Sequence, residues 1–364
     1  MPTSLASFVP PFCPRTSCRF HRCTAGWQWK HHGSFARRCA PRVIPRFRCV
    51  HCGVTFSSQT FSTSYYLKRP ELLETLFHRL LACSGYRQIA REARCAATTV
   101  MGQAARLGRH ALLYLAHHRP PAVDEPLVID GFESFAYSQF QPLHLNVAVG
   151  SESHFCYGFT FAPLRRKGRM TAAQKRVRAA LELRHGRPNP KAIEFEVAEL
   201  VRIAAPNTQE LTVHSDEHPA YPRAFARLDG LRIQHLQTPS VAARTTMNPL
   251  FPVNLLDLLL RHNSANHKRE TIAYSKRHQS VIERAALLIL WRNFTKRFSE
   301  NHDGGTPAMR AGICSTPRSP SVLLKERLFT THIVLPQRWQ EYYRRLIATP
   351  GIKRPRTHAL KRAF

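Results

Sequence analysis

The alternation of hydrophobic and polar positions is most regular between residues 127 and 161, where it predicts three strands. Residues 127–129 are continuously apolar and lead directly into Asp130. Apolar residues then recur at every second position over 143–149 and again over 155–161, which is the period of a β-strand. Three strands in succession favour an antiparallel meander.

Beyond these strands the pattern continues as helix, strand, helix and strand. Apolar residues at helical spacing occupy 195–203, and a short half-buried strand over 211–215 ends at Asp216. Pro219 opens the next helix, because proline fits the first helical turn, and 231–236 is the last strand. This order of elements is that of a ribonuclease-H-like domain, so we predict a mixed α/β fold for this region.

Two aspartates stand where strands of this domain end. In a ribonuclease-H-like sheet the first and fourth strands lie side by side, so Asp130 and Asp216 are expected to be neighbours. Two carboxylates this close repel each other, and a pair of divalent ions relieves the repulsion while activating water against a phosphodiester. We therefore predict a Mg2+ (or Mn2+) site. For each acid alone, the alternative is a helix cap, a surface charge or a salt bridge.

A third acid is expected from a helix that follows the last strand. Asp257 lies on a short apolar helix over 252–261, directly after that strand, and is the preferred ligand. Glu283 is the alternative third acid, although it needs a further element to bring it to the metal. Glu270 is another possibility.

Cysteines cluster at the start of the chain, where six of the ten precede residue 53. Four of them form two close pairs, Cys13 with Cys18 and Cys49 with Cys52. This spacing is typical of the knuckles of a zinc ribbon, and four thiolates around one Zn2+ make a structural site with no open position. A disulfide framework is the alternative, but there is no secretory signal pattern and the other cysteines are scattered.

A helix-turn-helix is predicted over 84–107. The interior contacts of such a motif fall on small or apolar residues here: Ile89, Ala90, Val100 and Leu107. If the motif forms, Thr98, Thr99 and Arg106 lie on or near the face offered to the major groove of DNA. An ordinary helical hairpin is the alternative, and the many basic residues nearby argue against it.

Charge narrows the choice of partner. The formal net charge is +31, from 54 Lys and Arg against 23 Asp and Glu, and such an excess indicates a polyanionic partner. No run of about 18 apolar residues suggests a membrane span, so we expect nucleic acid as the partner and a cytoplasmic location. The excess lies at both ends: 18 basic against 3 acidic residues in 1–120 and 23 against 7 in 231–364, whereas 121–230 has 13 of each.

Taken in this order, the features resemble a bacterial insertion-sequence transposase of the DDE type. The resemblance rests on the cysteine pairs, on the helix-turn-helix and on four short segments: 44–49, 129–130, 215–218 and 269–276. It implies a multidomain α+β protein with four parts: a zinc ribbon over 1–64, a helix-turn-helix domain over 65–119, a ribonuclease-H-like catalytic domain over 120–300, and a basic helical C-terminal extension over 301–364.

The resemblance also implies a reaction, DNA strand cleavage followed by strand transfer. Asp130, Asp216 and a third acid would hold Mg2+ for a cut at the element end, and the freed 3′-hydroxyl would attack target DNA. The partner is then double-stranded DNA, both terminal repeats and target, bound by a homo-oligomer. Further DNA contacts are expected from basic residues behind the catalytic helix: Arg261, Lys268, Arg269, Lys276 and Arg277.

The sequence departs from this family at one position. Where related enzymes carry the glutamate of their catalytic helix, this chain has Asn254, with Asp257 one turn later. Either Asp257 has taken the role, or Glu283 has, or this copy is inactive. Two other functions share parts of the pattern: a DNA-binding regulator with an inactive centre, and a structure-specific nuclease that uses the same acids.

Overall fold

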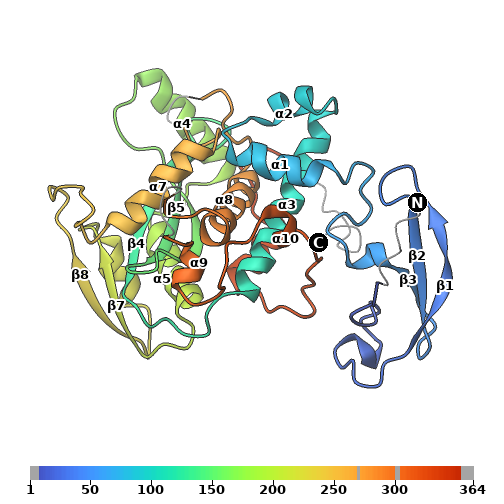
Figure 1. Cartoon of the computed structure of the whole chain (residues 1–364). Coiled ribbons are helices and arrows are strands. Elements are labelled where there is room, and N and C mark those ends of the chain that lie inside the picture. The colour runs from blue at the N-terminus through green and yellow to red at the C-terminus, as the bar shows by residue number, and fades with distance from the viewer. Residues whose placement is uncertain (1–7, 269–270, 300–303, 354–364) are drawn as a thin grey trace.

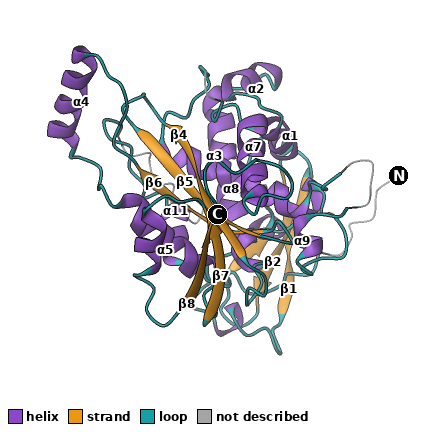
Figure 2. Ribbon diagram, turned by 90° about the vertical axis from the view of Figure 1, so that its left-hand side faces the viewer, coloured by secondary structure: helices purple, strands orange, loops and turns teal. Residues whose placement is uncertain are grey.

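The computed structural model describes residues 8–268, 271–299 and 304–353. It is a mixed α+β protein with two separate sheets, a three-stranded sheet at one end and a five-stranded sheet at the other (Figure 1). Helices lie between the two sheets (Figure 1) and on both sides of the larger one (Figure 2). The multidomain α+β class expected from the sequence is confirmed.

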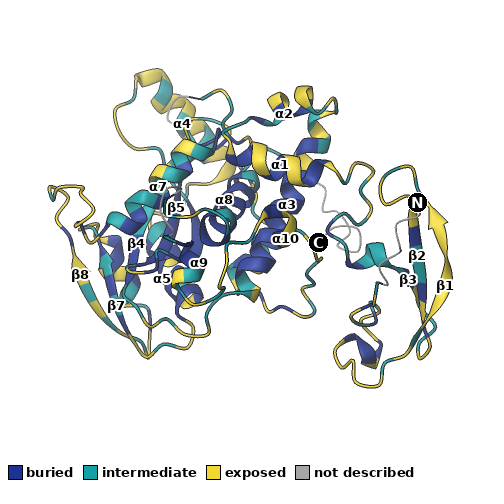
Figure 3. Ribbon diagram, viewed as in Figure 1, coloured by how far each residue is buried: buried dark blue, intermediate teal, exposed yellow. Residues whose placement is uncertain are grey.

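The small sheet is antiparallel, in the order β1-β2-β3, and it supports an aromatic core. Phe47 of β2 is fully buried and stacks on Phe56 of β3, with 5.8 Å between ring centroids. Phe329 joins this core from far along the chain through an edge contact with Phe12. Strand β1 is exposed along almost its whole length (Figure 3). The elements are η1 (Arg19–His21), β1 (Trp29–Ala36), β2 (Val43–Cys49), β3 (Thr55–Ser57) and η2 (Ser58–Phe61).

Helices α3 and α8 pack along each other in the centre of the molecule and are buried over most of their length (Figure 3). Their close approach requires Gly108, because a Cβ at that position would lie 2.5 Å from the Cβ of Glu283. No helix in the described ranges is long and apolar enough to cross a bilayer. The helices of this part are α1 (Leu72–Leu81), α2 (Tyr86–Glu92), α3 (Ala97–His117) and α8 (His278–Phe294).

The large sheet has the strand order β6-β5-β4-β7-β8. Strands β4, β5 and β6 form the antiparallel meander that was predicted, and β7 and β8 run parallel to β4 on its other side. The expectation that the first and fourth strands are neighbours is also confirmed. The strands are β4 (Leu127–Phe135), β5 (Pro142–Gly150), β6 (Cys156–Pro163), β7 (Glu210–Ser215) and β8 (Arg232–Gln237).

Alternate residues of the strands face different helices. On one face α5 packs against β5 and β6, close to Gly158, whose Cβ would meet Ile203 at 3.0 Å. On the other face Phe159 contacts Trp339 and Phe161 contacts His278, while α7 crosses β4 and β5. The helices here are α5 (Ala192–Ala204), α6 (Ala220–Phe225) and α7 (Phe251–Asn263).

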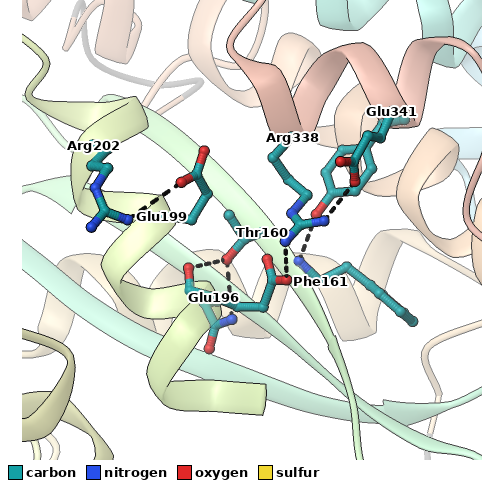
Figure 4. A network of polar contacts seen from close by, with 9 residues as sticks. Thr160, Phe161, Glu196, Glu199, Arg202, Arg338 and Glu341 are labelled. Atoms are coloured by element: carbon teal, nitrogen blue, oxygen red, sulfur yellow. Dashed lines mark hydrogen bonds and ion pairs between the residues drawn. The ribbon is translucent and has the colours of Figure 1, made fainter. Parts of the chain in front are cut away.

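The C-terminal segment returns to this sheet and ties α5 to the edge strand β6. Arg338 of α11 forms ion pairs with Glu196 of α5 at 2.8 Å and with Glu341 at 2.5 Å (Figure 4). Burial raises the pKa of Glu196 to about 7, and the charge of Arg338 opposes that rise. The hydroxyl of Thr160 in β6 donates to the Glu196 carbonyl at 2.8 Å. The C-terminal helices are α9 (Pro307–Arg310), α10 (Pro320–Leu323) and α11 (Gln337–Tyr343).

The hydrophobic pattern does not predict α4 (Ala172–His185), which forms within a basic stretch and projects from the body of the molecule (Figure 2). None of its residues is buried, so no core holds it in place. Its N-terminus is a capping box, in which the side chains of Thr171 and Gln174 each accept the other's backbone N–H. Besides this cap, α4 is held by polar contacts with the preceding segment, where Arg165 pairs with Glu182 at 2.7 Å and Arg178 donates to the Arg166 carbonyl at 3.0 Å.

Candidate functional site

Strands β4 and β7 bring two aspartates to one place. The strands pair in parallel with Leu127 opposite Val213 and Val128 opposite His214. The same register, continued, puts Asp130 level with Asp216, which directly follows the last residue of β7. Because the strands are parallel and in register, residues that lie level with each other have their side chains on the same face of the sheet, here at the carboxyl ends of both strands. The two carboxylates interact, since the charge of Asp216 raises the pKa of Asp130.

The Asp130 carboxylate is half-buried, held by hydrogen bonds and hard to ionise. The Gly131 N–H donates to its Oδ1 at 2.6 Å, and the Tyr221 hydroxyl donates to the same oxygen at 3.4 Å. Burial, followed by the charge of Asp216, raises the pKa of Asp130 to about 6, against the lowering effects of both hydrogen bonds and of Arg244. The carboxylate is thus fixed in direction but destabilised as an anion.

Asp257 reaches the same place from α7, which lies across β4 and β5. Burial raises the pKa of Asp257 well above its usual value, the charge of Asp130 raises it further, and Arg261 one turn later lowers it. Its Oδ1 is buried and has no hydrogen-bond partner within the described part of the chain. A buried carboxylate oxygen normally has a partner, so this oxygen points to a ligand of another kind.

Asp216 is held by the turn that follows β7. Its Oδ1 accepts the N–H of His218 at 3.0 Å, and its carbonyl accepts the Ser215 hydroxyl at 2.7 Å. The neighbouring Glu217 faces elsewhere, because its carboxylate accepts the N–H of Ser240 at 3.1 Å. The turn therefore sends Asp216, rather than Glu217, toward Asp130.

We call Asp130, Asp216 and Asp257 the aspartate cluster. Carboxylate oxygens are the ligands that Mg2+ and Mn2+ prefer, and the unpartnered oxygen of Asp257 fits a cation. Within the described ranges the four cysteines converge tightly enough to hold one metal ion between them, and the three aspartates do not form such a group.

Glu283, the alternative third acid, lies in a different environment. It is buried between α3 and α8, where its Oε1 pairs with Arg345 Nε at 2.9 Å and accepts from Gln279 at 3.3 Å. Burial raises the pKa of Glu283, and Arg345, Arg109 and the hydrogen bond from Gln279 oppose that rise. The structure does not bring Glu283 to the aspartate cluster. Glu270 lies outside the described residues.

The basic residues predicted to contact DNA differ in their exposure and in the contacts they already make within the chain. The Arg261 guanidinium stacks over the Phe132 ring at 4.5 Å, so it is held beside β4. Lys268 and Lys276 are exposed, and the Lys276 ammonium lies 3.3 Å from the centre of the Tyr274 ring. Arg277 is half-buried and donates to the Lys353 carbonyl at 2.6 Å. The predicted DNA contact Arg269 lies outside the described residues.

Two residues of the site escaped the sequence analysis. Tyr221, on the helix after Asp216, donates to Asp130, and Arg244 lowers the pKa of Asp130 from a loop after β8. Tyr221 could have been predicted, because it lies on the helix expected to begin beside Asp216. Arg244 could not, because it lies in a segment whose hydrophobic residues show neither helix nor strand spacing.

The predicted convergence of the four cysteines is confirmed. The sulfurs of Cys13, Cys18, Cys49 and Cys52, the cysteine cluster, all lie within 4.8 Å of one another. Cys49 ends β2, and Cys52 lies in the tight turn that follows, which the Gly53 N–H closes by donating to the Cys49 carbonyl at 3.0 Å; Gly53 has φ +71°. Burial raises the pKa of Cys49, but hydrogen bonds from the Cys52 and His51 N–H groups and the Trp27 indole lower it to about 7. These donors favour the thiolate of Cys49, whereas burial raises the pKa of Cys13 and Cys18. It is the convergence of four sulfurs that suits a tetrahedral zinc ion.

The two helices over 84–117 pack together as predicted, but one of the three predicted DNA-contact residues is buried. Ile89, Ala90, Val100 and Leu107 are all buried. Thr98 is exposed and Thr99 half-buried at the start of α3. Arg106 is buried, and its guanidinium donates to the carbonyls of Thr63 and Tyr65. The prediction that Arg106 lies on a DNA-facing surface is wrong, because the segment before α1 covers this part of α3.

Comparison with known proteins gives little further guidance. No protein-family model and no curated protein matches the sequence. Among solved structures, the chain is similar to the cryoEM structure of the simian T-cell lymphotropic virus intasome in complex with PP2A regulatory subunit B56 gamma. The match has 15% identity, covers 66% of this chain and 73% of that chain, and has a TM-score of 0.24. A TM-score this low does not establish a shared fold.

Proposed function

We propose that this protein is a DDE-type transposase of a bacterial insertion sequence, which cleaves DNA at the element end and transfers the freed strand. The observation that carries the proposal is the parallel register of β4 and β7, which makes Asp130 and Asp216 neighbours. Asp257 from α7 is the proposed third acid. The strand order with β4 beside β7 supports a ribonuclease-H-like catalytic domain.

In this proposal the chain's own residues prepare the site for a charged substrate. Two Mg2+ or Mn2+ ions bound by the aspartate cluster would supply an activated water and stabilise the leaving oxygen. Gly131 and Tyr221 fix the direction of the Asp130 carboxylate, so little reorganisation is needed when a ligand binds. Arg244 and Arg261 add positive charge beside the acids, where phosphates would lie.

The remaining parts are proposed to hold DNA and to place it at the aspartate cluster. The cysteine cluster would bind a structural Zn2+ in a zinc ribbon, and α2 with the start of α3 would act as the helix-turn-helix. Lys268 and Lys276 are exposed on the segment that follows α7, where they can meet phosphates. A homo-oligomer would bind the two ends of the element together.

Asn254 favours a second candidate, a DNA-binding regulator that has lost cleavage. Family members carry a glutamate on this helix, whereas Asn254 has no negative charge to offer a cation. The two proposals share every DNA contact. They differ only in whether the aspartate cluster works, so a cleavage assay separates them.

The test is cleavage of labelled duplexes that tile the DNA on both sides of the gene, with Mg2+ or Mn2+ and full-length protein. Asp130→Asn, Asp216→Asn and Asp257→Asn should each abolish cleavage and retain duplex binding. Glu217→Gln is the matched control, because it removes a carboxylate next to Asp216 that bonds elsewhere. Tight binding of one fragment without metal-dependent cutting by the unmodified protein would reject the transposase and support the regulator.

A further inference from the structure

A groove of about 1160 Å³ opens where the small sheet meets the segments 65–68 and 327–329. Its size exceeds the ~300–1,000 Å³ that is usual for a site holding one small molecule. Its walls come from three parts of the chain that are distant in sequence: the small sheet with the cysteine loops beside it, the segment before α1, and the C-terminal segment. A groove of this size suits a segment of a polymer better than a metabolite.

The charge of the lining has one sign. None of the described residues in the lining is acidic. Six are basic: Arg15, Arg37, Arg38, Arg46, Lys68 and Arg327. Arg37 is committed to the chain itself, because it bonds to Gln59 and to the Pro41 carbonyl. Arg38 and Lys68 are exposed. The groove therefore offers an anion several cations at its rim.

Aromatic rings stand among these cations. Tyr66 is 63% exposed, with its backbone in the left-handed region at φ +60°, which is uncommon for a bulky residue. Its ring lies 4.6 Å from the Tyr65 ring, centroid to centroid, at an interplanar angle of 84°, and both tyrosines line the groove. Phe35, 42% exposed on β1, lines the groove as well. Because Tyr66 and Phe35 are exposed, packing of the protein core does not explain these two rings.

We propose that this groove binds an unpaired nucleic-acid strand, with bases stacked on Tyr66 and Phe35 and phosphates paired with Arg38, Arg46 and Lys68. Cations alone would serve any polyanion, but interleaved aromatic rings favour a ligand with flat, exposed bases. Bases of a duplex are stacked on each other and cannot reach such rings. The inference goes beyond the proposed cleavage and does not depend on the aspartate cluster.

The stacking half of the proposal is tested with the full-length, zinc-loaded protein and two fluorescent probes, a 20-nucleotide oligothymidine and a 20-base-pair duplex. Tyr66→Ala should weaken oligothymidine binding about tenfold, as expected for one lost stacking partner, and should leave duplex binding unchanged. Tyr137→Ala is the matched control, because Tyr137 is also exposed (43%) with φ +63° but lies outside the groove. It should change neither affinity.

The charge half is tested by salt dependence. Arg38→Gln combined with Lys68→Gln should lower the slope of log affinity against log salt by about 1.4 for oligothymidine, roughly 0.7 per lost phosphate contact. Arg22→Gln with Arg42→Gln removes equal charge from exposed residues of the same module outside the groove and should leave the slope nearly unchanged.

Zinc content and circular dichroism establish that each variant is folded, and Phe35→Ala is a second variant for stacking if Tyr66→Ala fails that check. Equal weakening of both probes by Tyr66→Ala would make the groove a duplex site and overturn the proposal. Unchanged affinity for both probes in Tyr66→Ala would also overturn the proposal. Binding of the protein to anionic lipid vesicles but to neither probe would indicate a membrane surface instead. Asp216→Asn should retain oligothymidine binding, so a failure of the cleavage proposal is distinguishable from a failure here.

Discussion

The cysteine cluster and the aspartate cluster differ in how tightly their ligand atoms converge. In the cysteine cluster, four sulfurs lie within 4.8 Å of one another; burial raises the pKa of Cys13 and Cys18, and N–H donors lower the pKa of Cys49 to about 7. In the aspartate cluster, burial and mutual repulsion raise the pKa values of Asp130 and Asp257. The first arrangement is closed and suits a permanent structural ion, whereas the second remains destabilised until cations arrive.

The strongest way to sharpen this comparison is to remove one sulfur. Cys49→Ser should abolish stoichiometric zinc and unfold the three-stranded sheet, because zinc contributes about 10–16 kcal/mol of apparent binding free energy in small zinc modules. Zinc analysis by mass spectrometry and the emission of Trp27 and Trp29 report the change. Cys23→Ser is the control, since Cys23 is exposed and outside the cysteine cluster. A Cys49→Ser protein that keeps one zinc per chain would contradict a closed four-sulfur site.

A second experiment asks which acid belongs to the aspartate cluster. Asp257→Asn should weaken Mn2+ binding at least about tenfold, or ~1.4 kcal/mol, as measured by electron paramagnetic resonance. Glu283→Gln should leave Mn2+ binding unchanged but lower the melting temperature, because losing one partner of a buried ion pair costs about 3–5 kcal/mol. The reverse pattern would transfer the role of third acid to Glu283.

The pH dependence of cation binding follows from Asp130. Its pKa of about 6 means that protons compete with cations near that value, so Mn2+ affinity should rise as pH increases from 5 to 7. Titration calorimetry at several pH values checks this. Asp130→Asn should reduce the pH dependence over this range, and the part that remains reports Asp257, whose pKa burial also raises. An unmodified protein with constant affinity between pH 5 and 7 would argue against an Asp130 ligand.

The smallest expected effect is on the stability of the metal-free protein. The folded-state pKa of Asp130 lies above its unfolded value, so protonation stabilises the fold below about pH 4, and this contribution is lost as pH rises through about 6. Asp130→Asn should therefore raise the melting temperature at pH 7.5 by a few degrees, about 1 kcal/mol. Saturating Mg2+ should reverse the order of the two proteins. A destabilised metal-free variant would mean that the carboxylate has a structural role.

The comparison also explains what the sequence could reveal. The cysteine cluster depends on close spacing and a Gly53 turn, which are local, so the pattern was sufficient. The meeting of Asp130 and Asp216 depends on strand order. The hydrophobic pattern predicted the succession of strands and helices, and only the likeness of that succession to a ribonuclease-H-like domain predicted which strands are neighbours. Their catalytic roles stay predictions.

Long-range contacts account for what the sequence could not reveal. Arg106 has the spacing of a groove-facing residue, but carbonyls of Thr63 and Tyr65 cover it. The pairing of Glu283 with Arg345 leaves no signal near either residue. Helix α4 was missed for the opposite reason, since it buries nothing and so has no apolar face from which to predict a helix.

The contact between Phe329 and the core of the small sheet has a consequence for synthesis of the chain. The aromatic residues Phe12 and Phe61 leave the ribosome early, whereas Phe329, which covers both, follows roughly 270 residues later. At usual elongation rates this delay is on the order of tens of seconds. Until then the aromatic core of the small sheet lacks one of its members. A metal captured early by the cysteine cluster would keep it from aggregating until the last segment arrives.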